Sequence, residues 1–161
     1  MSTMASDDFH EKLAEGVRGE DAVYQYLTTT NSYVEDTRYQ KYTEGQGPKL
    51  RGIEGAVTLP DFVVYDRFKG NYAVDVKVKT SVYTVHQQPC FTVDYKYLHY
   101  LKVMELKRLD FLVLAFVYQN DLYWYTNSDL HGTTQFENQY SRGDVYLFAH
   151  DPAKIKCRLA I

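Results

Sequence analysis

The sequence is poor in cysteine and in long apolar runs, and both shortages exclude classes of protein. Its 161 residues include two cysteines, Cys90 and Cys157, which lack the spacing of a metal-binding motif. Two thiols make no disulfide framework, so we expect both to be reduced. The longest strongly apolar run, residues 111–118, is too short to cross a bilayer, and residues 1–8 lack the pattern of a signal peptide. We therefore expect a cytoplasmic protein that makes no membrane contact.

Excess positive charge is also missing. The formal net charge is −3, from 18 basic and 21 acidic residues. Such a balance gives no global attraction to nucleic acid, so binding to DNA would need a local basic patch or metal ions. The chain contains no internal repeat, linker or recognisable added DNA-reading module. Its composition, 45% hydrophobic and 24% charged, indicates one globular domain over residues 1–161.

Tyrosine, in contrast, is abundant, with 16 copies. Tyrosines stack on bases or line interfaces, and they also suit half-buried strands. Because most of them lie in strand-like segments, we favour the strand explanation.

The first predicted helix covers residues 8–28. Asp8 suits the N-cap, and Glu11 three residues later is close to a capping box. An apolar stripe at helical spacing comprises Phe9, Leu13, Val17, Tyr24 and Leu27. Glu20 falls near the middle of this stripe, where a carboxylate is costly unless it is paired or bound to a metal ion.

A β-hairpin is predicted from residues 62–65 and 72–82, joined by a turn at 67–71. Its second strand alternates, with one side formed by Val74, Val76 and Val78 and the other by Asp75, Lys77 and Lys79. Residues 29–60 are harder to order and contain a candidate strand at 33–42 and a glycine-rich loop at 45–55.

The remaining elements complete an α/β pattern. Pro89 is expected to interrupt the regular secondary structure. After it, a helix capped by Asp94 is predicted to run to about Arg108, with Leu98, Leu101 and Glu105 on one side. Strands are predicted at 111–118, 122–126 and 145–149, and an edge strand or tail at 154–161. This order predicts a central mixed β-sheet flanked by helices.

The hairpin carries the residues best suited to chemistry. Asp61 begins its first strand, and Asp75 and Lys77 share one face of its second strand. Two carboxylates that face each other hold a hard cation through oxygen ligands, and the carbonyl of Val76 is a natural further ligand. An adjacent ammonium orients or deprotonates a water and offsets charge on a phosphate.

The pattern Pro60-Asp61 followed by Asp75-Val76-Lys77 resembles the signature of the PD-(D/E)XK nuclease superfamily, which has the restriction-endonuclease-like fold. The resemblance covers roughly residues 8–125, by the order of elements rather than by close similarity. It implies that Asp61 and Asp75 bind Mg²⁺ or Mn²⁺ and that Lys77 serves the attacking water. The small single-domain form looks most like the Holliday-junction resolvases and phage-encoded nucleases of this superfamily.

The resemblance leaves the third carboxylate open. A glutamate on the preceding helix often completes the family's site, and Glu20 stands there, but Glu54 just upstream of Asp61 is a rival. Glu20 has the alternative of pairing with a nearby lysine. Some branches carry a glutamine on the helix after the lysine strand, which this chain lacks, and Lys96 is the residue that would contact phosphate instead. Lys79 extends the same face as Asp75 and Lys77, where it could contact phosphate, but we favour placement at the surface.

Three functions remain open from the sequence. The first is a DNA nuclease that uses Mg²⁺ or Mn²⁺, for which cleavage of both strands by so small a domain favours a homodimer. The second is a catalytically inactive nucleic-acid-binding or inhibitor protein of the same fold. The third is an aromatic-rich interaction protein, in which Asp75 and Lys77 form an ordinary solvated strand face and Asp61 ends a turn.

Overall fold

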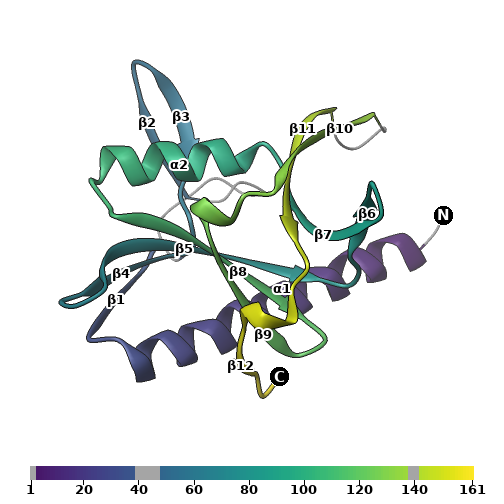
Figure 1. Ribbon diagram of the computed structural model, residues 1–161, viewed down its shortest axis with the longest axis horizontal. Helices are drawn as coiled ribbons and strands as arrows, with labels where there is room; N and C mark the ends of the chain where they lie inside the picture. The colour runs from purple at the N-terminus through teal and green to yellow at the C-terminus, as the bar shows by residue number, and fades with distance from the viewer. Residues whose placement is uncertain (1–2, 39–47, 138–141) are drawn as a thin grey trace.

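A mixed six-stranded β-sheet forms the centre of the protein, with one α-helix on each side (Figure 1). The computed structural model describes residues 3–38, 48–137 and 142–161. The α-helices are α1 (Thr3–Thr30) and α2 (Lys96–Leu106). The central strands are β1 (Tyr33–Asp36), β4 (Phe62–Asp66), β5 (Gly70–Lys79), β8 (Phe111–Tyr118), β9 (Asp121–Thr126) and β12 (Ile155–Arg158).

The central sheet has the order β1-β4-β5-β8-β9-β12. β1, β4 and β5 pair antiparallel, whereas β8 pairs parallel to β5. A parallel neighbour needs a crossover connection, and the chain from β5 to β8 includes α2. The expected α/β fold with a mixed central sheet and helices on its faces is therefore confirmed.

The two faces of the sheet are filled by different layers. Val74 and Val76 of β5 pack with Val23 and Leu27 of α1 in one buried cluster. The alternate residues face α2 and a second sheet, so that Ala73 packs in another cluster. The period-2 alternation of β5 thus directs aliphatic side chains toward α1 and directs Asp75, Lys77 and Lys79 toward the α2 side.

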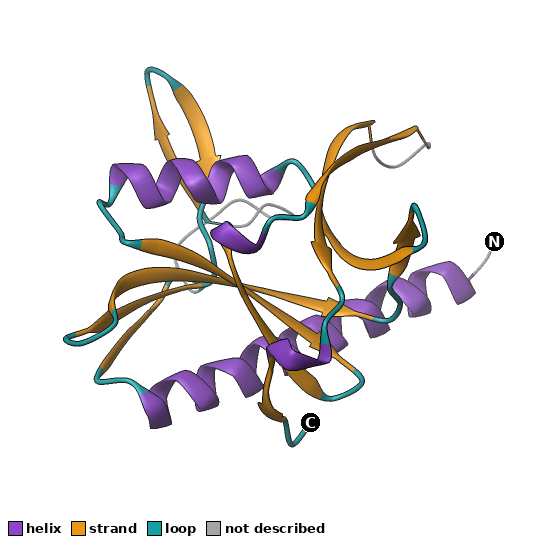
Figure 2. Ribbon diagram, viewed as in Figure 1, coloured by secondary structure: helices purple, strands orange, loops and turns teal. Residues whose placement is uncertain are grey.

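A second, four-stranded sheet lies on the α2 side and was not expected from the sequence (Figure 2). Its order is β10-β11-β7-β6, formed by β6 (Tyr83–Val85), β7 (Gln88–Val93), β10 (Gly132–Glu137) and β11 (Arg142–Ala149). Pro89 was expected to break the chain, but it lies within β7 and pairs with Thr84. Aromatic rings join this sheet to the central one, as in the stacked pair Phe91 and Phe116 at 4.7 Å.

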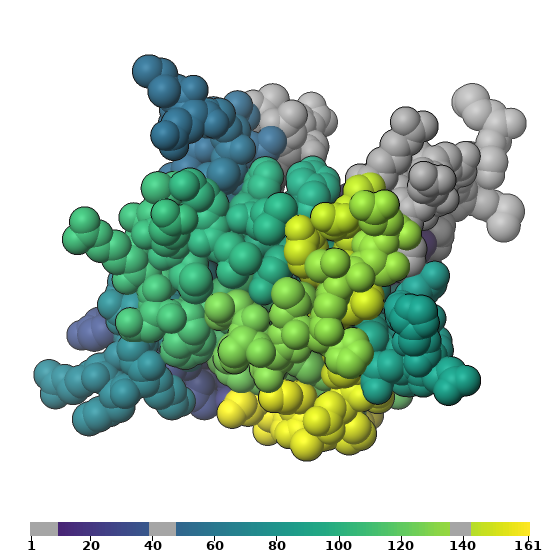
Figure 3. All heavy atoms as spheres, turned by 45° about the horizontal axis from the view of Figure 1, so that its top comes forward, coloured from purple at the N-terminus to yellow at the C-terminus, as the bar shows by residue number. Residues whose placement is uncertain are grey.

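A separate hairpin, β2 (Lys49–Gly52) and β3 (Gly55–Thr58), lies beside α2 at the surface (Figure 3). The backbone N–H of Thr58 donates to His99 Nδ1 of α2 at 2.8 Å, which ties the end of β3 to the helix. β4 begins shortly after Thr58, and Asp61 lies between them. The contact with His99 is therefore close to Asp61 along the chain.

Both helices differ in detail from expectation. α1 begins at Thr3 rather than near Asp8, and two residues of the expected apolar stripe, Leu13 and Val17, are exposed, whereas Leu27 is buried. In α2 the buried residues are Tyr97, Tyr100 and Val103 rather than the side that carries Leu98 and Glu105. Tyrosines supply the buried face of α2, which an aliphatic pattern search does not detect.

Gly19 lets α1 approach β5 closely. A Cβ atom at this position would overlap Cγ2 of Val78 on β5. We therefore expect Gly19→Ala to lower the free energy of unfolding by about 1–3 kcal/mol, the usual cost of overpacking. Urea denaturation measures the change.

Gly16→Ala is the matched control, because a Cβ atom at this position would meet no other atom within 4 Å. It should be neutral or stabilise by up to about 1 kcal/mol through helix propensity. Equal effects of the two substitutions would contradict the close approach. In the Gly19→Ala background, Val78→Ala should recover part of the loss.

Candidate functional site

Asp61 and Asp75 meet where β4 stops and β5 continues. The pairing of Phe62 with Val74 places Asp61, one residue before β4, opposite Asp75. β5 extends past this last pair to Lys79, so its edge there is not covered by β4. The backbone N–H of Val76 on this edge donates to Asp61 Oδ2 at 2.8 Å.

Thr37 fixes the backbone that carries Asp61. It is fully buried, its N–H donates to the carbonyl of Asp61 at 3.0 Å, and its hydroxyl donates to the same carbonyl at 2.8 Å and to that of Pro60. The segment after β1 therefore holds the start of β4 in place. The sequence offered no signal for this role of a single threonine.

Asp75 is a carboxylate inside the fold, with 3% of its surface exposed. Its Oδ2 lies 3.1 Å from the Lys77 ammonium, yet it accepts no well-aligned hydrogen bond from any described residue. A buried carboxylate oxygen without a full set of donors is costly. This oxygen is therefore a candidate ligand for a bound cation.

Lys77 is held between Asp75 and Tyr100. Its Nζ donates to the Tyr100 hydroxyl at 3.2 Å and lies 5.4 Å from the centre of that ring. Burial disfavours the ammonium, but the charge of Asp75 and the contact with Tyr100 outweigh it and raise the pKa of Lys77. Lys77 is therefore protonated at neutral pH. The role of Tyr100, which lies on α2, was not recognised from the sequence.

Glu20 belongs to the same electrostatic environment. Burial raises the pKa of Glu20, Arg38 opposes this, and the charge of Asp75 adds to it. Burial, and then the charges of Asp75 and Glu20, likewise raise the pKa of Asp61 well above its ordinary value. The three carboxylates singled out in the sequence thus act on one another across the end of β4.

Arg38 is the partner of Glu20, where the sequence suggested a lysine as the alternative. Its Nη1 lies 3.5 Å from Glu20 Oε1 and 3.0 Å from Asp21 Oδ1. Two further contacts join its guanidinium to Asp36, at 2.9 and 2.8 Å. With the ring of Phe62 4.8 Å away and 9% of its side chain exposed, Arg38 forms a fixed cation beside the carboxylates.

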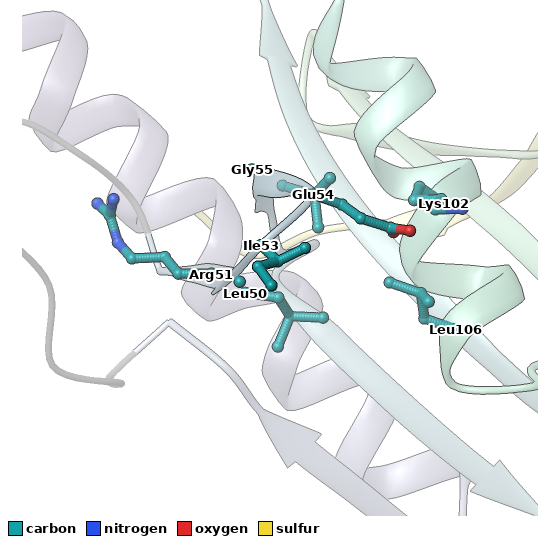
Figure 4. A pocket seen from close by; sticks show the side chains of 9 residues that line it. Leu50, Arg51, Ile53, Glu54, Gly55, Lys102 and Leu106 are labelled. Atoms are coloured by element: carbon teal, nitrogen blue, oxygen red, sulfur yellow. The ribbon is translucent and has the colours of Figure 1, made fainter.

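Glu54 lies apart from this group. It occupies the β2–β3 turn, which with α2 lines a pocket of about 410 Å³. Its carboxylate points toward Lys102 of α2 (Figure 4). Of the two rivals for a third carboxylate, Glu20 is the one whose charge acts on Asp61.

Lys96 lies at the first turn of α2, where its backbone N–H donates to Asp94 Oδ1 at 3.0 Å. Tyr95 rather than Asp94 occupies the N-cap position of α2, and its side chain makes no capping hydrogen bond. A contact of Lys96 with phosphate stays a prediction.

Within the described ranges, no three His, Cys, Asp or Glu side chains come close enough together to hold a metal ion. Asp61 and Asp75 are two carboxylates that the register of β4 and β5 places opposite each other. Comparison of the chain with family models, curated proteins and solved structures finds no match. No helix among the described residues has the length and apolar character needed to span a membrane.

The raised pKa of Asp61 predicts how its charge affects stability. Folding favours the protonated carboxyl, so this stabilisation is complete below the ordinary pKa of 3.8 and is lost as the pH rises through the raised value. Asp61→Asn removes the charge and keeps an oxygen for the Val76 N–H. In chelator at pH 7 we expect the variant to be more stable than wild type by about 1 kcal/mol.

Urea unfolding at a series of pH values checks this prediction. The advantage of Asp61→Asn should shrink as the pH falls toward 3.8, because the wild-type carboxyl is then protonated as well. A variant less stable than wild type at pH 7 would instead make Asp61 a structural turn residue.

Proposed function

We propose that the protein is a metal-dependent nuclease that hydrolyses phosphodiester bonds of DNA. Asp61 and Asp75 bind the divalent ion, and Lys77 serves the attacking water. The observation that carries the proposal is the meeting of two carboxylates at the open edge of β5, with the Lys77 ammonium 3.1 Å from Asp75. Buried like charges at one place destabilise the fold, so such a group of residues is a candidate functional site.

The residues present suit a magnesium-type ion. Mg²⁺ is commonly held by one or two protein carboxylates together with waters and substrate phosphates, so a group of three protein ligands is not required. Asp75 Oδ2 is buried and lacks a well-aligned donor, and the charges around Asp61 repel its ionised form. A cation between the two would relieve both costs.

The backbone of Val76 fits the same arrangement. A strand residue directs its N–H and its carbonyl to the same edge of the strand. Because the Val76 N–H donates to Asp61, its carbonyl also faces the edge of β5 that β4 leaves open. This supports Val76 as the further oxygen ligand.

Lys77 acts as a donor of positive charge and hydrogen bonds. Its pKa is raised, which favours this role over that of a general base. The ammonium, held by Tyr100, orients the water and offsets negative charge that develops on the phosphate oxygens. When bound, Mg²⁺ or Mn²⁺ polarises the phosphate and lowers the pKa of a coordinated water.

The order of elements supports the restriction-endonuclease-like fold and the PD-(D/E)XK resemblance. α1, the β4–β5 hairpin, α2 and β8 occur in this order along the chain, with other strands between them. The helices lie on opposite faces of the sheet, and β8 is parallel to β5 (Figure 1). The acidic pair and the lysine stand on the hairpin, where the motif places them. Cleavage of both strands of a duplex would then bring two copies of the chain together.

One observation favours a second function, an inactive DNA-binding or inhibitor protein of the same fold. Glu20 is already paired with Arg38, and Asp75 with Lys77, so the carboxylates have protein cations beside them. A site that has lost its metal would keep such pairs. Binding of DNA without cleavage, in the presence of Mg²⁺, would select this alternative.

Lys77→Met tests the role of the lysine. The substitution keeps most of the aliphatic stem and removes the ammonium, so we expect nicking of a supercoiled plasmid in Mg²⁺ to fall by at least about 100-fold, the scale of one electrostatic contact to a transition state. Lys102→Met, a half-exposed lysine on α2, is the control and should cut at the wild-type rate. Wild-type cleavage by Lys77→Met, with its fold verified by circular dichroism, would contradict the assignment.

The choice of metal tests the two-carboxylate site. Mg²⁺ and Mn²⁺ should support cleavage, and Ca²⁺ should bind without supporting it, because its longer and looser coordination holds water and phosphate less productively. The measurement is plasmid nicking with each ion in turn and with excess chelator. Cleavage that persists in chelator would refute a metal mechanism.

A further inference from the structure

Lys79 is the second lysine on the α2 face of β5, and its surroundings differ from those of Lys77. The sequence favoured a surface position for Lys79, but the residue is half-buried. Its Nζ is 3.5 Å from Thr92 Oγ1 of β7, a distance at the limit of a hydrogen bond. No carboxylate among the described residues lies within ion-pair distance of this ammonium, whereas Lys77 has Asp75 at 3.1 Å.

The neighbouring charges leave Lys79 short of a counter-ion. Burial and the positive charge of Lys77 lower the pKa of Lys79 to about 8, and the more distant carboxylates of Asp94 and Asp75 oppose this only in part. Asp94 Oδ1 already accepts the backbone N–H of Lys96. A partly desolvated ammonium without an anion beside it is costly, and the ammonium groups of Lys77 and Lys79 on one strand face repel each other.

We propose that Lys79, with the Thr92 hydroxyl, forms a phosphate subsite that binds a phosphodiester group of the nucleic-acid substrate next to the one cut at Lys77. This inference rests on the proposed function. The site takes a non-bridging oxygen of a monoanionic phosphodiester, for which an ammonium and a hydroxyl are suitable donors.

The position of Lys79 on β5 indicates which phosphate of the substrate it would contact. It lies two residues beyond Lys77 on the same face of β5, so their Cα atoms are about 6.6 Å apart along the strand. Neighbouring phosphates of one nucleic-acid strand can therefore face the two lysines in turn. Lys77 has Asp75 as a protein partner, and Lys79 gains its partner only from the substrate.

The salt dependence of DNA binding tests the subsite without requiring cleavage. A labelled DNA duplex is titrated with wild type and Lys79→Met in chelator over a series of KCl concentrations. Loss of one phosphate contact should reduce the slope of log K against log [KCl] by about 0.9 and weaken binding near 0.1 M salt by about tenfold. An unchanged slope in Lys79→Met would overturn the inference.

Matched variants separate a lost contact from a damaged fold. Lys79→Arg keeps the charge and should keep the slope. Lys69→Met removes an exposed lysine from the β4–β5 turn, at the opposite end of β5, and should leave the slope unchanged. Lys79→Met should melt no lower than wild type, because it removes an ammonium that lacks an anionic partner.

The source of the phosphate is tested with inorganic phosphate as a second probe. Tighter binding of inorganic phosphate than of the duplex would assign the site to a free anion and overturn the subsite. Cleavage by wild type with an unaltered slope and KM in Lys79→Met would overturn the subsite and leave the nuclease intact. A reduced slope in Lys79→Met, in a case where wild type never cleaves DNA, would support the subsite and refute the proposed function. Failure of wild type to bind the duplex would refute both.

Discussion

The arrangement of the candidate site depends on how the charge of the Asp75 carboxylate is compensated inside a β-sheet. β5 is an interior strand with β4 on one side and β8 on the other, and Asp75 is 3% exposed. A charge in this position must be compensated by neighbours of opposite sign or by a bound cation. Lys77 supplies part of the compensation, and Tyr100 holds Lys77 in place from α2. Two residues on the α2 side of the sheet, Lys77 and Tyr100, are thus positioned by one carboxylate.

Unequal strand lengths explain why the charged groups gather where they do. β4 has five residues and β5 has ten, so the edge of β5 that carries Val76 extends past its partner. The Val76 N–H finds the side chain of Asp61 instead of a strand. On the other face, Gly19 brings α1 against Val78 and places Glu20 next in the chain. Strand ends and a close helix together form the site that we propose to be catalytic.

Part of this arrangement was predictable because it follows from local rules. The alternation of residues 72–79 predicts which side chains share a face of the strand, and the turn at 67–71 predicts that the two strands form a hairpin. Asp61, Asp75 and Lys77 could therefore be placed together from the sequence. The α/β class followed from the order of periodic segments.

The rest depends on contacts between distant segments. The sheet of β6, β7, β10 and β11 joins residues far apart in the chain, and Pro89 within it contradicts the local rule that proline breaks a strand. Arg38 pairs with Glu20 from beyond the end of α1, and Tyr100 reaches Lys77 from another helix. Such partners carry no periodic signal, so a sequence pattern cannot reveal them.

Titration of the protein with Mn²⁺, followed by electron paramagnetic resonance, tests most directly whether Asp61 and Asp75 hold a divalent ion. Wild type should bind Mn²⁺ at a site from which Mg²⁺ displaces it, and Asp61→Asn should bind at least about tenfold more weakly, which corresponds to about 1.4 kcal/mol. Equal binding of Mn²⁺ by the two proteins, or no binding by wild type, would contradict a metal site at these two carboxylates.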